Sequence, residues 1–191
     1  YHPARIYDPD FTDSRHLFIH GLFTDHGGTC TSMPVFYVAV GRRLGYPLRL
    51  VNAKAHVFLR WDDAEGLSGF PPERVNIEGS TRGMDSHSDE FYHDWPMQIQ
   101  REELEAGQYL HSLTPREAVA SFLALRGNCL QDNARFDEAA HAYRYACLFA
   151  PHIHRYQMWN CVNAGLCGIP VPDEFQEIKA IVLAEKERIT A

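Results

Sequence analysis

The sequence has no excess of positive charge and no long hydrophobic run. Its net charge is −7, because 25 acidic residues outnumber 18 lysines and arginines. Nucleic-acid surfaces carry clustered positive charge, so we expect no nucleic-acid partner. No apolar stretch approaches the ~20 residues of a membrane-spanning helix, so we expect no membrane partner either. The chain begins at Tyr1 without a signal-peptide pattern, which is compatible with a cytoplasmic protein and with a piece of a longer one.

The spacing of the cysteines excludes the common zinc motifs. The chain has 5 cysteines, an odd number with no CxxC pair among them. Cys129 and Cys147 lie in apolar helical stretches, where a cysteine usually acts as a small hydrophobic residue. We therefore predict free thiols in a reducing compartment, and neither a metal nor a cofactor.

The chain has two regions of different texture. Residues 1–108 mix short apolar runs with glycine and proline, whereas residues 109–191 are patterned as helices. Thr114 is a typical N-cap, because Pro115 follows it and Glu117 stands three residues later. Further helices are predicted for three segments: 135–151, from about 154 onward, and 173–189.

The first two helices of residues 109–191 resemble a tetratricopeptide repeat. Six residues fall at its small, aromatic and proline positions: Gly127, Phe136, Ala139, Tyr143, Ala146 and Pro151. Because about three repeats are needed to bury a core, we expect this tail to pack on the first region. It then serves either as a structural cap or as a groove for a protein partner.

Cys30 has the surroundings of a reactive thiol. Gly27 and Gly28 precede it and allow a tight turn. The residues after it predict a helix whose apolar face carries four side chains: Met33, Phe36, Val40 and Leu44. Cys30 would then open this helix, where unpaired amides and the helix dipole favour a thiolate and lower the thiol pKa.

Three predicted strands supply a base and an acid. Segments 47–54, 56–61 and 74–78 are rich in β-forming residues, and His56 and Glu78 share one face of the sheet. A register that sets His56 opposite Glu78 also sets Arg60 opposite Arg74, which is unfavourable. A shift of two residues removes this clash and keeps the faces, so both registers stay open.

These three residue types form a set for acyl chemistry. An imidazole can take the proton of a thiol, a carboxylate can fix the imidazole tautomer, and the thiolate can attack a carbonyl. The imidazolium then protonates the leaving amine, and the Cys30 amide can donate to the oxyanion.

The order cysteine, histidine, acid resembles the transglutaminase-like superfamily. The segments GTC, HVFLRW and VNIEGS, followed by LTPRE, resemble its bacterial branch that carries a tetratricopeptide-type tail. The resemblance implies an α+β fold with papain-like ancestry, in which the cysteine helix packs on an antiparallel sheet. It also implies cysteine chemistry on an amide-type bond of a peptide or protein substrate. Cys30 matches the nucleophile, His56 the base, and Glu78 the position that aspartate usually takes.

Two features depart from that pattern. Glutamate is a methylene longer than aspartate and requires a different strand spacing. No glutamine or tryptophan shortly before Cys30 can serve as the second oxyanion donor, which leaves Thr24, His26 or an upstream segment as candidates.

Two other interpretations remain for the sequence as a whole. Metal-binding side chains gather in the segment 84–95 (His87, Asp89, Glu90, His93 and Asp94), but Ser86 or Ser88 followed by acids also predicts a capped helix. The second interpretation is a non-catalytic scaffold whose tail binds a partner. Loop aromatics could line a cleft or pack in the core: Phe70, Phe91, Tyr92 and Trp95.

Overall fold

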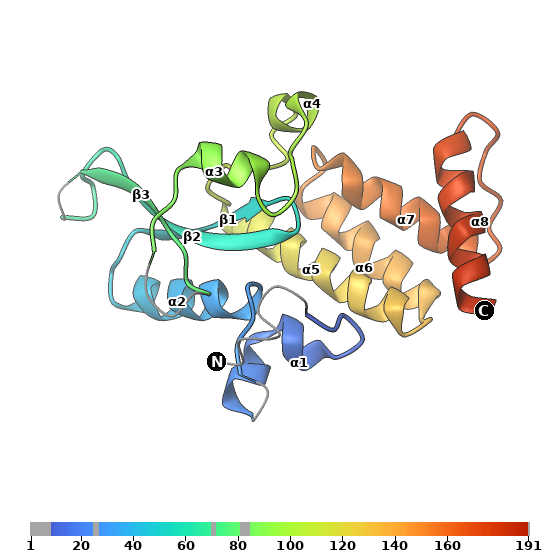
Figure 1. The fold of residues 1–191 in the computed structure, drawn as a ribbon, viewed down its shortest axis with the longest axis horizontal. Helices are drawn as coiled ribbons and strands as arrows, with labels where there is room; N and C mark the ends of the chain where they lie inside the picture. Colours follow the sequence, from blue (N-terminus) through green and yellow to red (C-terminus); the bar gives the residue numbers. More distant parts are fainter. Residues whose placement is uncertain (1–8, 25–26, 70–71, 81–84, 191) are drawn as a thin grey trace. The chain divides into compact units, whose positions relative to one another are not determined.

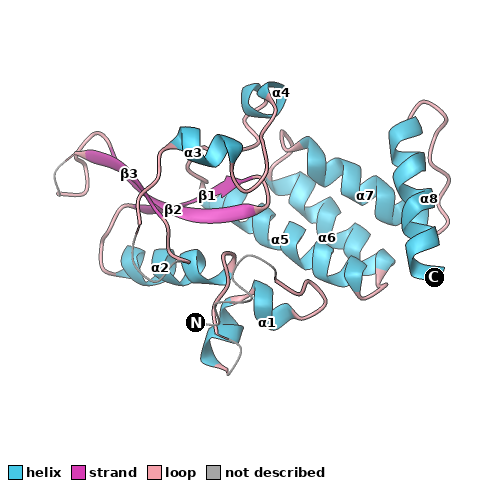
Figure 2. Cartoon of the chain, viewed as in Figure 1, coloured by secondary structure: helices cyan, strands magenta, loops and turns pink. Residues whose placement is uncertain are grey.

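A computed structural model describes residues 9–24, 27–69, 72–80 and 85–190. The chain divides into two compact units, Tyr1–Thr114 and Pro115–Ala191. No helix among the described residues is both long enough and apolar enough to cross a membrane. The fold is α+β, with a small antiparallel sheet in the first unit and only helices among the described residues of the second (Figure 2).

The sheet has three antiparallel strands in the order β1–β2–β3. They are Leu48–Ala53, His56–Asp63 and Glu73–Ile77, in agreement with the predicted segments. Arg60 lies opposite Asn76 and Asp62 lies opposite Arg74. This is the register shifted by two residues, and it replaces an arginine–arginine contact with an Arg74–Asp62 ion pair of 3.6 Å.

Helices cover both faces of the sheet (Figure 1). Helix α2, Ser32–Arg43, packs on the face of Leu59, where its Tyr37 ring lies close to Gly79. Helix α3, Asp89–Asp94, packs on the opposite face, where the Tyr92 ring stacks on Phe58 at 3.9 Å. The side chains of β2 therefore alternate between two covered faces, which accounts for its nearly continuous burial.

The buried face of α2 differs from the predicted one. Val40 is 42% exposed and Leu44 is 65% exposed, whereas the buried residues of α2 are small: Ser32, Pro34, Val38 and Gly41. A Cβ atom on Gly41 would lie 2.4 Å from Leu48 Cδ1. The helix thus approaches the sheet through its small residues. Of the predicted apolar face, Met33 and Phe36 are partly buried and Val40 and Leu44 are exposed.

Three short helical segments and one extended segment complete the described part of the first unit. The helical segments are α1 (Ser14–Leu17), the 3₁₀ helix η2 (Ile19–Phe23) and α4 (Arg101–Glu105). Residues 110–113 run beside β1: the amides of Leu110 and Leu113 donate to the carbonyls of Asn52 and Leu50 at 2.9 and 2.8 Å. The compact unit consequently extends past residue 108, where the texture of the sequence changes.

The second unit is a succession of four helices: α5 (Pro115–Asp132), α6 (Phe136–Phe149), α7 (His154–Leu166) and α8 (Gln176–Thr190). Their positions agree with the predicted segments. A Cβ atom on Gly127 would lie 2.7 Å from the Tyr143 ring, so α5 and α6 meet closely there. The buried Asn163 amide of α7 donates to Gln131 of α5 at 2.8 Å. That the unit is tetratricopeptide-like, and that it packs on the first unit, stay predictions.

Candidate active site

Cys30 lies in the opening turn that leads into α2. The Met33 amide donates to the Thr29 carbonyl at 3.1 Å, which is a helical bond, and the Thr29 amide donates to Ser32 Oγ at 3.0 Å. The hydroxyls of Thr29 and Thr31 both donate to the buried carbonyl of His16. These bonds tie the turn to α1 and place Cys30 at the helix start, as predicted.

The two glycines before Cys30 have separate roles. Gly27 has a φ of 68°, a left-handed conformation that glycine adopts without strain. A Cβ atom on Gly28 would lie 2.2 Å from Met33 Sδ and 2.7 Å from Leu22 Cδ2. Gly27 therefore provides the turn, and Gly28 lets the backbone pass beneath Met33.

The state of the Cys30 thiol differs from the predicted one. The side chain is buried, with the residue 4% exposed. Burial raises the pKa of Cys30 to about 12, and the charge of Glu78 adds to the rise, while the Cys30 amide lowers it only in part. Desolvation thus outweighs the helix terminus, and the thiol is neutral at neutral pH.

His56 and Glu78 form a buried pair on one face of the sheet. His56 Nε2 lies 2.7 Å from Glu78 Oε2, and both side chains are almost inaccessible to solvent. In the observed register Glu78 follows the last residue of β3, and it is the diagonal rather than the direct neighbour of His56. A diagonal contact spans a longer distance than a direct one, and the longer glutamate side chain can reach across it. This explains how glutamate can stand at the position that aspartate usually takes.

The Glu78 carboxylate is surrounded by hydrogen-bond donors. Oε1 accepts from the amide of Ser80 at 2.9 Å and from its hydroxyl, and Oε2 accepts from the Tyr92 hydroxyl at 3.0 Å as well as from His56. Burial by itself would raise the pKa of Glu78, but the hydrogen bond and charge of His56 and the two bonds from Ser80 lower it to about 2. Glu78 is therefore ionised at neutral pH.

Direct contact joins only two of the three predicted residues. The charge of Glu78 reaches Cys30, but the thiol makes no hydrogen bond to His56 among the described side chains. Catalytic hydrogen bonds are often long or poorly aligned without substrate and shorten when it binds. Ser80 and Tyr92 were not predicted as members of the site. Ser80 stands two residues after Glu78, a spacing typical of local side-chain bonds, whereas no sequence signal connects Tyr92 to Glu78.

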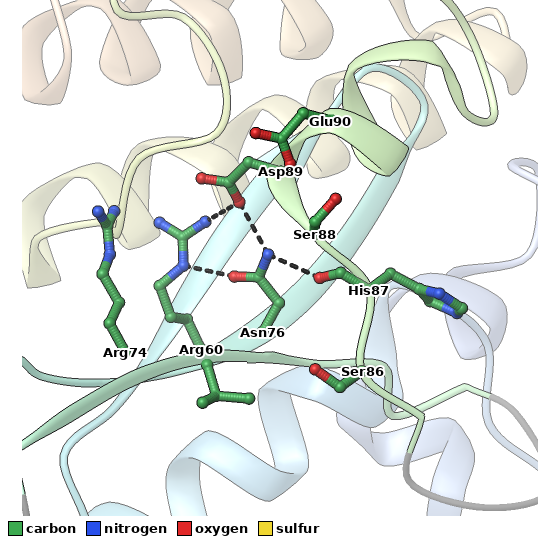
Figure 3. Close-up of a pocket in the computed structure, with 9 residues that line it drawn as sticks. Arg60, Arg74, Asn76, Ser86, His87, Ser88, Asp89 and Glu90 are labelled. Atoms are coloured by element: carbon green, nitrogen blue, oxygen red, sulfur yellow. Dashed lines mark hydrogen bonds and ion pairs between the residues drawn. The ribbon is translucent and has the colours of Figure 1, made fainter.

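A second polar cluster, centred on the buried residues Arg60 and Asn76, lies further along the same face (Figure 3). Arg60 Nε donates to Asn76 at 2.6 Å, and its other nitrogens reach Asp89 at 2.5 Å and the Leu110 carbonyl at 3.2 Å. Asn76 in turn donates to Asp89 and to the His87 carbonyl. A hollow of about 440 Å³ beside this cluster is also lined by Arg74. These bonds connect β2, β3 and the start of α3.

The potential ligands of the segment 84–95 do not converge on a metal site. Ser88 caps α3 by accepting from the Phe91 amide, which agrees with the capped-helix interpretation. Asp89 turns to Arg60 and His93 pairs with Asp94 at 2.6 Å. Among the described residues of this segment, no three ligand atoms gather.

The remaining candidates take other roles or lie outside the described residues. The Thr24 hydroxyl donates to the Gly21 carbonyl at 2.8 Å within its own turn. Phe91 is 39% exposed, and Trp95 lies edge-on to His56 at 4.9 Å. His26 and Phe70 are not among the described residues.

Comparisons with known proteins place the chain in a family. The model of the transglutaminase-like superfamily matches residues 6–123, more than half of the chain. F-box only protein 21 of Mus musculus is 40% identical over 60 residues, and its Homo sapiens counterpart is 36% identical over 60. Each alignment covers 31% of this chain and 10% of the relative. No solved structure shows a significant match. The chain belongs to the transglutaminase-like superfamily.

Proposed function

We propose that the first unit is a cysteine-dependent hydrolase or acyltransferase that acts on an amide-type bond of a peptide or protein. The observation that carries this proposal is the buried His56–Glu78 contact of 2.7 Å. An ionised carboxylate can only accept, so Nε2 carries the proton and Nδ1 is left as the base. A histidine fixed in this tautomer is the base that nucleophilic catalysis by a cysteine requires, and the same unit holds Cys30 at a helix start.

The neutral thiol sets the order of proton transfers. Cys30 does not rest as a thiolate, so His56 Nδ1 takes the thiol proton as Sγ bonds to the substrate carbonyl carbon. The carbonyl π electrons move to oxygen, and the Cys30 amide in the opening turn of the helix donates to that oxyanion. When the intermediate collapses, the C–N bond breaks and the imidazolium gives its proton to the leaving amine. The product is a thioester on Cys30.

The acyl acceptor decides between the two reaction classes. Water attacking the thioester, with His56 as base, releases an acid and completes hydrolysis or deamidation. An amine attacking it forms a new amide and completes acyl transfer. Both routes return the proton to the Cys30 sulfur and use the same three side chains.

A peptide library incubated with and without an added primary amine tests the proposal. Mass spectrometry separates cleavage, deamidation and amine incorporation, because each changes the peptide mass differently. We expect at least one of these products with the wild-type chain and none with Cys30→Ala. Equal product formation by the Cys30→Ala variant would contradict the proposal.

A non-catalytic scaffold is the second candidate, and the burial of Cys30 favours it. In that case the helical unit, with its close contact between Gly127 and Tyr143, acts as a tetratricopeptide-like surface for a protein partner. A folded chain that forms no product with any peptide, with or without amine, supports this candidate.

A further inference from the structure

The Glu78 carboxylate shares one oxygen between two donors. Oε1 is occupied by Ser80, whereas Oε2 accepts from both His56 Nε2 at 2.7 Å and the Tyr92 hydroxyl at 3.0 Å. Glutamate has one more side-chain torsion than aspartate, so a single contact would leave Oε2 free to turn away from the histidine. The bond from Tyr92 fixes that oxygen on its second side.

Tyr92 is itself held rigidly. Its side chain is completely buried, and its ring lies parallel to the Phe58 ring, with 6° between the planes and 3.9 Å between centroids. The segment that carries it is attached to the sheet before and within α3: the Glu78 amide donates to the Asp85 carbonyl at 2.7 Å, and Asp89 binds Arg60. Because the Tyr92 hydroxyl is held in place, it can fix the position of the Glu78 carboxylate.

We propose that Tyr92 is a positioning residue for the Cys30–His56–Glu78 site: its hydroxyl orients Glu78 and withdraws charge from the oxygen that faces His56. This inference rests on the proposed function for its catalytic consequence. The inference goes beyond the proposed function, because Tyr92 then sets how strongly Glu78 stabilises the protonated form of His56.

Loss of the hydroxyl has two separable consequences. Glu78 loses one of its four hydrogen bonds, so its carboxylate is held less firmly, which misplaces the imidazole and lowers the rate. More negative charge also remains on Oε2, which favours the imidazolium and moves the acid limb of the pH–rate profile to higher pH. If Tyr92 served packing alone, loss of its hydroxyl would change neither the acid limb of the pH–rate profile nor the titration of His56.

Tyr92→Phe tests this in the full chain, because it removes the hydroxyl and keeps the ring. We expect kcat/KM to fall about 3- to 10-fold and the acid limb to rise by about 0.5 to 1 pH unit. Tyr143→Phe is the matched control, since this buried tyrosine donates to Asn128 in the helical unit and leaves both quantities unchanged. A Tyr92→Phe variant with the wild-type pH profile overturns the proposal.

A readout that needs no turnover separates the two proposals. NMR titration of the ¹⁵N-labelled His56 ring reports its protonation directly, and we expect a higher midpoint in Tyr92→Phe. An inactive chain that still shows this shift refutes the proposed function and keeps the coupling, whereas an unchanged midpoint refutes the coupling. Should Tyr92→Phe not fold, 3-fluorotyrosine at position 92 serves instead. It is a stronger donor of similar shape, and it must shift the His56 midpoint downward; a midpoint that does not fall overturns the proposal.

Discussion

The two ion pairs that β2 forms on one face of the sheet, His56–Glu78 and Arg60–Asp89, both have short contacts but differ in chemistry. The His56 and Arg60 side chains are each 1% exposed, and both come from β2. Arginine stays protonated throughout the physiological range, whereas histidine can take and release a proton. Burial and pairing therefore do not by themselves mark a catalytic residue, and the capacity to move a proton beside a nucleophile does.

The two pairs also differ in what they connect. The carboxylate of Glu78 collects donors from His56, Ser80 and Tyr92 around one charge whose field reaches Cys30. The guanidinium of Arg60 distributes its donors over separate chain segments and joins the sheet to α3. We interpret His56–Glu78 as the pair that takes part in proton transfer (the chemical pair). We interpret Arg60–Asp89 as the pair that holds α3, and with it Tyr92, on the sheet (the structural pair).

Neutralising each carboxylate separates these roles most strongly. Glu78→Gln removes the charge that stabilises the imidazolium, and we expect kcat/KM to fall about 100-fold or more. Asp89→Asn, the matched change at the other pair, should lower it less than about threefold per folded molecule. Steady-state kinetics corrected for the folded fraction checks this. Losses of similar size in both variants would erase the distinction between the pairs.

Acid should weaken the His56–Glu78 pair. The pKa of Glu78 is lowered to about 2 in the folded chain, below its unfolded value near 4.5. A lowered carboxyl pKa stabilises the fold above the unfolded value, and this contribution is lost as the pH falls from about 4.5 through about 2. Its size is on the order of 3 kcal/mol. Urea unfolding from pH 6 to pH 2 should show the loss in the wild type and a flatter dependence in Glu78→Gln. Parallel curves would contradict the assignment.

The Arg60–Asp89 pair should matter more for stability than the Arg74–Asp62 pair, because the Arg60 guanidinium is buried and that of Arg74 is half-exposed. Asp89→Ala leaves the buried Arg60 guanidinium without its carboxylate, and we expect about 2–3 kcal/mol of lost unfolding free energy. Arg74→Ala breaks a half-exposed ion pair with Asp62, so less than about 1 kcal/mol should be lost. Chemical denaturation measures both, and equal effects would show that the Arg60 cluster does not fasten α3.

Local patterns in the sequence were sufficient for much of the site. The turn glycines and the following helix placed Cys30, and two-residue alternation placed His56 and Glu78 on one face. The arginine clash raised a second register that stayed open beside the first, and the structure has this second register. These features depend on neighbours along the chain or on one adjacent strand, which is why sequence reasoning reached them.

Features that depend on burial or on distant contacts could not be predicted. The pKa of Cys30 follows from desolvation, which local sequence does not report, so its rise to about 12 was missed. The packing side of α2 follows from how closely Gly41 approaches Leu48. Tyr92 reaches Glu78 across 14 residues because α3 folds back over the sheet.

The relative reactivity of Cys30 and Cys167 towards iodoacetamide at neutral pH tests the central claim most directly. Cys30 is the buried thiol and Cys167 the exposed one, so accessibility alone predicts that Cys167 reacts first. If His56 takes the proton of Cys30 as the sulfur attacks an electrophile, mass spectrometry should show Cys30 alkylated faster than Cys167, although the resting thiol is neutral. In His56→Ala, Cys30 should become slower than an unchanged Cys167. Rates that follow exposure in both proteins would contradict a nucleophilic Cys30.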